Sequence, residues 1–85
     1  MDHERPFTTE ELEEVILHLC RMKAEEFAVI GYEQVSEREI RNYFNDKYRH
    51  KGHPPLHQLV NDILSLSVPQ FMNWMTMQAF KGAPF

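Results

Sequence analysis

The sequence predicts an all-α protein, a compact domain of four helices, and three observations support this. Apolar residues recur at helical spacing, Ser or Thr caps precede three of the apolar segments, and no run of β-branched residues indicates a strand. A chain of 85 residues that is 42% hydrophobic can bury one small core. We therefore expect one domain over residues 1–85, with flexible ends at 1–7 and 82–85 and with helices at residues 9–30, 37–49, 56–65 and 68–81.

The first expected helix begins after Thr8, which fits a capping box together with Glu11. Its apolar stripe comprises Leu12, Val15, Ile16, Leu19, Met22, Phe27 and Ile30. Lys23 interrupts this stripe, and we expect its aliphatic stem to lie on the core edge while its ammonium group remains in water. Gly31 supplies the left-handed residue that ends the helix.

The second and third expected helices have equally clear boundaries. Ser36 and Glu39 form a second capping box, and the inner face that follows comprises Ile40, Tyr43 and Phe44. The Pro54–Pro55 pair, which follows Gly52, forces a loop and places Pro55 to begin the third helix. That helix has the cleanest amphipathic pattern in the chain, with the apolar residues Leu56, Leu59, Val60, Ile63 and Leu64.

The fourth expected helix begins with a third capping pair, Ser67 and Gln70, and is apolar around much of its circumference. One broad face carries Phe71, Met72, Trp74 and Met75, whereas Met77 and Phe80 project away from it. A surface helix of a small monomer needs only one apolar face, so a second one indicates a docking surface. The residues predicted to bind a partner are Trp74, Met77, Phe80 and Phe85.

The net charge of −4 is unevenly distributed along the chain. Residues 1–37 carry ten acids and three bases, whereas residues 38–57 carry two acids and five bases. An acidic protein does not attract nucleic acid or a membrane surface through its overall field, but a local basic segment with aromatic residues can hold a single RNA strand. The candidate RNA-binding residues are Arg38, Arg41, Lys47, Arg49 and Lys51.

Catalytic and metal-binding functions find little support in the sequence. His50, His53 and His57 have a spacing that invites a metal, but Gly52 and the two prolines break the regular geometry between them, and solvated loop histidines are the better interpretation. No activated nucleophile or glycine-rich phosphate loop is present, so we predict no enzyme activity, no metal and no cofactor. The lone Cys20 and the acidic, polar N-terminus favour a reducing, cytoplasmic setting without membrane insertion.

Two strings carry a resemblance to a known family, IGYEQVSEREI at residues 30–40 and LHQLVNDILSLSV followed by QFMNWMTMQAFK at residues 56–81. Across most of residues 27–81 the chain resembles the ComN family of post-transcriptional regulators from Bacillus-type bacteria. Two departures from the family pattern are Tyr48, where a tryptophan is typical of the basic stretch, and Pro69. The resemblance implies a small, non-enzymatic, cytoplasmic protein that acts on the messenger RNA of a competence operon. It also implies a link to the coiled-coil scaffold DivIVA at cell poles and division sites.

Three hypotheses follow for the function. The first is an adaptor or regulator that affects gene expression at the RNA level by binding a protein partner. The second is direct contact with messenger RNA through the basic segment. The third is a homodimer that forms through the fourth helix.

Overall fold

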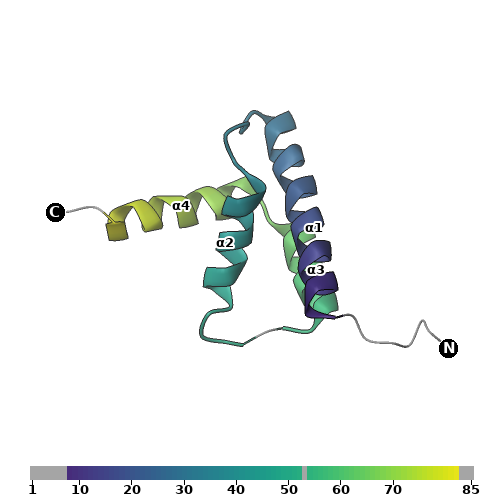
Figure 1. Cartoon of the computed structure of the whole chain (residues 1–85). Coiled ribbons are helices and arrows are strands. Elements are labelled where there is room, and N and C mark those ends of the chain that lie inside the picture. The colour runs from purple at the N-terminus through teal and green to yellow at the C-terminus, as the bar shows by residue number, and fades with distance from the viewer. Residues whose placement is uncertain (1–7, 53, 83–85) are drawn as a thin grey trace.

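The computed structural model describes residues 8–52 and 54–82. These residues form four helices and no strand: α1 (Thr9–Ile30), α2 (Glu37–Lys47), α3 (Leu56–Ser65) and α4 (Val68–Gly82) (Figure 1). The predicted all-α, four-helix class is therefore confirmed, and the bounds of α1 and α3 match the prediction. α2 ends two residues earlier than predicted, because Tyr48 begins a tight turn in which Arg49 N–H donates to the Asp46 carbonyl.

The three predicted caps are all formed at helix N-termini. The backbone N–H of Glu11 donates to Thr8 Oγ1 at 3.1 Å, and the Glu11 carboxylate accepts from the Thr8 N–H at 2.8 Å. The same reciprocal pair joins Ser36 to Glu39 and Ser67 to Gln70. Each pair satisfies N–H groups that have no partner within the helix, which explains why the helices begin where the sequence predicts.

Gly31 ends α1 as predicted. Its φ of 122° is strained for a residue with a Cβ, and its N–H donates to the carbonyls of Phe27 and Ala28. The N–H of Tyr32 also donates to the Phe27 carbonyl, at 2.8 Å, which completes a Schellman-type ending. The chain can therefore reverse direction and run back along α1 as α2.

The core forms where α1, α2 and α3 pack together and where the first turns of α4 close one end (Figure 1). Its fully buried side chains are Cys20, Phe27, Ile40, Phe44, Ile63 and Phe71. Aromatic rings from three helices meet in this core, with Phe71 of α4 edge-on to Phe27 of α1 at a centroid distance of 5.8 Å. The Phe71 ring therefore anchors α4 to the rest of the domain.

Several side chains in the predicted apolar stripes lie elsewhere. Met22 and Ile30 of α1 and Leu64 of α3 are exposed. Lys23 was expected to keep its ammonium in water, and this expectation was wrong. Its side chain is buried, and Nζ donates to the Leu64 carbonyl at 2.8 Å and to the Glu26 carboxylate. Lys23 thus holds the end of α3 against α1.

α4 leaves the body of the domain after its first turns (Figure 1). Val68, Phe71, Met72, Trp74 and Met75 pack against the core, and all five lie in the N-terminal half of this 15-residue helix. The C-terminal half extends away from α1 and α3, and its Met77 and Phe80 are exposed. Among the described residues, therefore, only one of the two apolar sides of α4 packs against the core.

Candidate functional site

The exposed half of α4 carries two of the four predicted partner-binding residues as large apolar side chains in solvent. Met77 is 52% exposed and Phe80 is 65% exposed. Trp74 lies one turn before Met77 and is half-buried, and Phe85 lies outside the described residues. The prediction that α4 presents apolar side chains beyond the core-facing ones is confirmed for Met77 and Phe80.

Trp74 is fixed in place by contacts with α2. Its Nε1–H donates to Asp46 Oδ2 at 2.9 Å, and its ring lies edge-on to Tyr43 at a centroid distance of 5.5 Å. A third ring, that of Phe71, lies 5.8 Å away on the core side. Trp74 is therefore a rigid wall of the site, whereas Met77 keeps a flexible and uncovered thioether.

A hollow of about 340 Å³ lies where α4 crosses α2, and we call it the α2–α4 hollow. Its lining residues are Tyr43, Asp46, Lys47, Gln70, Asn73, Trp74 and Met77. Of this set, only Lys47, Trp74 and Met77 were predicted as site residues from the sequence, and Lys47 was predicted to bind RNA. Tyr43 and Asp46 could not be placed there from the sequence, because no local pattern indicates which side of α2 meets α4.

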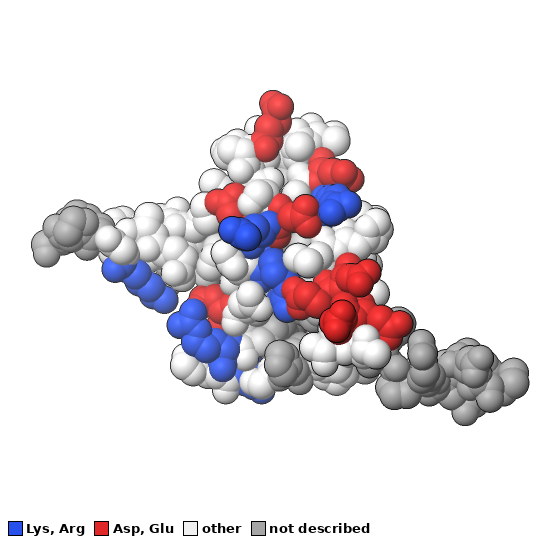
Figure 2. All heavy atoms as spheres, in the orientation of Figure 1, with Lys and Arg blue, Asp and Glu red and all other residues white. Residues whose placement is uncertain are grey.

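Positive charge gathers around this hollow. The Arg49 guanidinium contacts Asp46 Oδ1 at 2.8 Å. The hydrogen bond from Trp74 lowers the pKa of Asp46, and the nearby charges of Arg49, Lys81 and His50 lower it further. Figure 2 shows Lys and Arg side chains on both sides of the corner between α4 and the C-terminal end of α2, while Asp and Glu gather over the N-terminal half of α1. The exposed apolar surface of α4 thus lies at the basic end of an acidic protein.

Three of the five candidate RNA-binding residues are paired with carboxylates. Arg41 turns toward α1, where its Nε and Nη2 donate to both carboxylate oxygens of Glu13 at 2.9 and 3.0 Å, and this hydrogen bonding lowers the pKa of Glu13. Lys47 lies 3.8 Å from Asp62, and Arg49 binds Asp46. Arg38 and Lys51 are exposed at opposite ends of the basic segment and form no ion pair with any other described residue.

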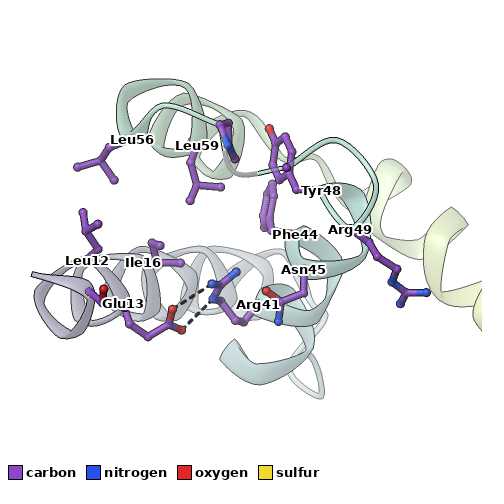
Figure 3. Close-up of a pocket in the computed structure, with 13 residues that line it drawn as sticks. Leu12, Glu13, Ile16, Arg41, Phe44, Asn45, Tyr48, Arg49, Leu56 and Leu59 are labelled. Atoms are coloured by element: carbon purple, nitrogen blue, oxygen red, sulfur yellow. Dashed lines mark hydrogen bonds and ion pairs between the residues drawn. The ribbon is translucent and has the colours of Figure 1, made fainter.

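A second and larger pocket, of about 570 Å³, opens between α1, α2 and α3 (Figure 3). Leu12 of α1 and Leu56 of α3 face each other across it, and Ile16, Phe44 and Leu59 line its inner part. The Glu13–Arg41 ion pair closes one side, while Arg49 points away. These apolar residues were predicted from the sequence to belong to the core, and no pocket was predicted. The pocket depends on the spacing between α1 and α3, which no sequence pattern gives.

The chemistry of the remaining candidates is limited. Cys20 is fully buried, and loss of solvation raises the pKa of its thiol to about 11, so the thiolate needed for nucleophilic attack does not form near neutral pH. His50 and His57 are exposed, His53 lies outside the described residues, and no three metal-ligating side chains cluster in the part that is described. None of the four helices combines the length and the apolar character needed to cross a membrane.

Together, the fold and the site define a small helical domain with an exposed apolar helix surface. A family model described as "Post-transcriptional regulator" matches residues 9–84. The post-transcriptional regulator ComN of Bacillus subtilis (strain 168) is 33% identical over 81 residues, which cover 94% of this chain and 70% of that protein. No solved structure matches the chain. The chain belongs to the post-transcriptional regulator family, and the predicted resemblance is confirmed.

Proposed function

We propose that this protein regulates gene expression after transcription by binding a partner protein through the exposed side of α4, without catalysing a reaction. The observation that carries the proposal is that α4 leaves the core and exposes Met77 and Phe80, at 52% and 65%. Flexible thioethers and aromatic rings are enriched at surfaces that accept an amphipathic helix. Membership of the regulator family supports the regulatory part of the proposal.

The partner that we propose is the coiled-coil scaffold DivIVA, on the basis of the family resemblance. A coiled coil supplies long helices, and an exposed apolar helix such as α4 can pack against a helix of the scaffold. Binding to DivIVA would bring this cytoplasmic protein to cell poles and division sites. The effect on the messenger RNA of a competence operon would then be indirect.

The docking proposal can be tested by measuring the affinity of the purified protein for purified DivIVA by calorimetry. Alanine at both Met77 and Phe80 should weaken binding by about thirtyfold or more, because truncation of anchor residues costs about 1–2 kcal/mol each. Helical content should not change, since both side chains lie outside the core. Met22→Ala is the matched control, because Met22 is a methionine of similar exposure, 47%, on α1. Equal affinities of the double variant and the control would refute the proposal.

Direct RNA binding through the basic segment is the second candidate, favoured by the exposed and unpaired state of Arg38 and Lys51 among the described residues. Each phosphate contact with a single strand contributes about 0.7 to the slope of log affinity against log salt. Charge reversal at Arg38 and Lys51 should therefore flatten this slope by roughly 1.4 if both residues contact phosphate. If the unmodified protein shows no salt-sensitive RNA binding at low ionic strength, this candidate fails.

A homodimer through α4 is a third use of the same surface. Light scattering over a range of protein concentrations distinguishes it from the other two. A mass that stays monomeric at all concentrations discards the homodimer, whereas a dimer that Met77→Ala dissociates would show that α4 pairs with itself.

A further inference from the structure

We propose that the α2–α4 hollow accepts an acidic amphipathic helix, whose apolar side chains contact Trp74 and Met77 and whose carboxylates face the basic residues around the hollow. This inference rests on the proposed docking function, and it specifies the chemistry of the segment that docks.

The shape fits side chains from one face of a helix. At about 340 Å³, the hollow lies near the lower end of the range of about 300–1,000 Å³ for small-molecule pockets, so it can take a few anchor side chains but cannot enclose a helix. Its walls come from Tyr43 on α2 and from Trp74 and Met77 on α4. Trp74 and Met77 are three residues apart and share one side of α4, as the wall of a groove that receives a helix requires.

The charge around the hollow favours a partner segment with negative charge. Lys81 is the only charged residue of α4, and three further bases lie at the C-terminal end of α2 and in the turn after it, namely Lys47, Arg49 and Lys51. The acids nearby are Asp46, already bound by Trp74 and Arg49, and Asp62, which lies 3.8 Å from Lys47. The bases that line the hollow or act on its Asp46, which are Lys47, Arg49 and Lys81, outnumber Asp46 and Asp62 and leave a net positive surface.

The acidic side chains at the opposite end of the molecule also favour binding of an acidic partner at the hollow. Glu10, Glu11, Glu13 and Glu14 lie on the N-terminal half of α1, where Figure 2 shows a dense group of acidic side chains. An acidic partner is therefore attracted to the end of the domain that carries the hollow and repelled from the acidic end. Electrostatic complementarity of this kind sets orientation and association rate more than raw affinity.

The aromatic rings favour a protein helix over RNA as the occupant. Single-stranded RNA is held by bases that stack on exposed aromatic faces. Here the Trp74 ring is packed against both Tyr43 and Phe71, and its N–H is already bonded to Asp46. Met77, the most exposed apolar side chain that lines the hollow, offers a thioether for apolar packing.

Trp74 is the single tryptophan of the chain and forms a wall of the hollow, so its fluorescence reports occupancy directly. The probe is a designed peptide of about 20 residues, long enough to form a helix, with leucine on one face and glutamate on the other. Titration into the purified full chain should shift the Trp74 emission to a saturating value. A matched peptide with lysine in place of glutamate should produce no shift, and added salt should weaken the binding of the glutamate peptide.

Charge-reversal variants locate the interaction. Lys47→Glu together with Lys81→Glu should lower the affinity for the glutamate peptide about tenfold, because each reversed surface charge changes the binding free energy by roughly 0.5–1 kcal/mol. The matched control is Arg38→Glu together with Arg21→Glu, which makes the same charge change at exposed positions that do not line the hollow. This control should leave the affinity unchanged.

Three outcomes would overturn the inference: equal binding of the glutamate and lysine peptides, equal loss in the control variant, or a Trp74 shift with an oligouridine strand and none with the glutamate peptide. The docking proposal fails separately. If alanine at Met77 and Phe80 weakens DivIVA binding while both peptides bind equally, α4 is a docking surface without a preference for acidic partners. If those alanines have no effect on DivIVA, the docking proposal itself fails.

Discussion

The indole nitrogen of Trp74 lies 2.9 Å from Oδ2 of Asp46, and this hydrogen bond ties α4 to α2 at the edge of the candidate site. Trp74 was predicted as a partner-binding residue, but the bond uses its only polar group within the protein. The other oxygen of the same carboxylate forms an ion pair with the Arg49 guanidinium, 2.8 Å away. Asp46 thus connects the turn after α2 with α4 and sets the shape of the α2–α4 hollow.

Replacement of Asp46 by alanine should release the Trp74 indole and shift its emission to longer wavelength, because the N–H then bonds to water. Asp46→Asn keeps an acceptor oxygen and should shift the emission less. Because the Trp74 bond lowers the pKa of Asp46 in the folded protein, it stabilises the fold at a pH above the ordinary value of this group. That contribution should be lost as the pH falls through the lowered pKa, which an acid titration of the Trp74 emission would detect.

Phe71 and Met77 lie on the same helix, six residues apart, and should respond in opposite ways to truncation. Phe71→Ala should cost about 3–5 kcal/mol of the free energy of unfolding, because it empties a fully buried site at the junction of three helices. Met77→Ala should change the free energy of unfolding by less than about 0.5 kcal/mol, since its side chain is half in solvent. Urea denaturation of both variants makes the comparison. A large loss for Met77→Ala would mean that this side chain belongs to the core.

Lys23 on α1 holds α3 in place, and its aliphatic stem and its charge should contribute separately to the free energy of unfolding. Lys23→Ala should destabilise the protein by about 2–3 kcal/mol, because it removes a buried stem together with the hydrogen bond to the Leu64 carbonyl. Lys23→Met keeps the apolar stem and should cost less. Chemical denaturation of the two variants gives the difference. If methionine proves as damaging as alanine, the ammonium group and its bonds outweigh the packing of the stem.

Cys20 should make the stability depend on pH in the alkaline range. Burial raises the pKa of its thiol from 9.0 to about 11 in the folded protein, so the unfolded chain releases this proton first as the pH rises. The folded state should therefore lose stability progressively from about pH 9 to about pH 11, by up to about 3 kcal/mol from this group. Cys20→Ala should lack this component of the pH dependence. Parallel pH slopes for the two proteins would contradict the prediction.

Local signals in the sequence were sufficient to predict the helices. The pairs Thr8–Glu11, Ser36–Glu39 and Ser67–Gln70 each lie within one turn, so their hydrogen bonds form wherever the helix forms. The stop at Gly31 is equally local, since it depends on a single φ angle. The end of α2 was placed too late, because no cap residue marks it and the turn at Tyr48 is completed by its hydroxyl bond to Asp62 of α3.

The candidate site could be predicted only in part, for a physical reason. The helical pattern of α4 showed that Met77 and Phe80 project away from the side that carries Phe71 and Met75, because the direction of a side chain follows from its position along a helix. How much of α4 the domain covers depends on where α4 lies relative to α1 and α2. A sequence pattern contains no information on that placement.

The sequence by itself determined the four helices, their caps, the acidic and basic ends and the family. Each of these depends on residues that are close together in the chain or on the order of residues along it. Only the tertiary structure decided that Asp46 holds Trp74, that Arg41 is bound by Glu13, that Lys23 is buried, and that a hollow forms between α2 and α4. These contacts join residues 28 to 41 positions apart or depend on burial, and both are set by how rigid helices pack rather than by local preference.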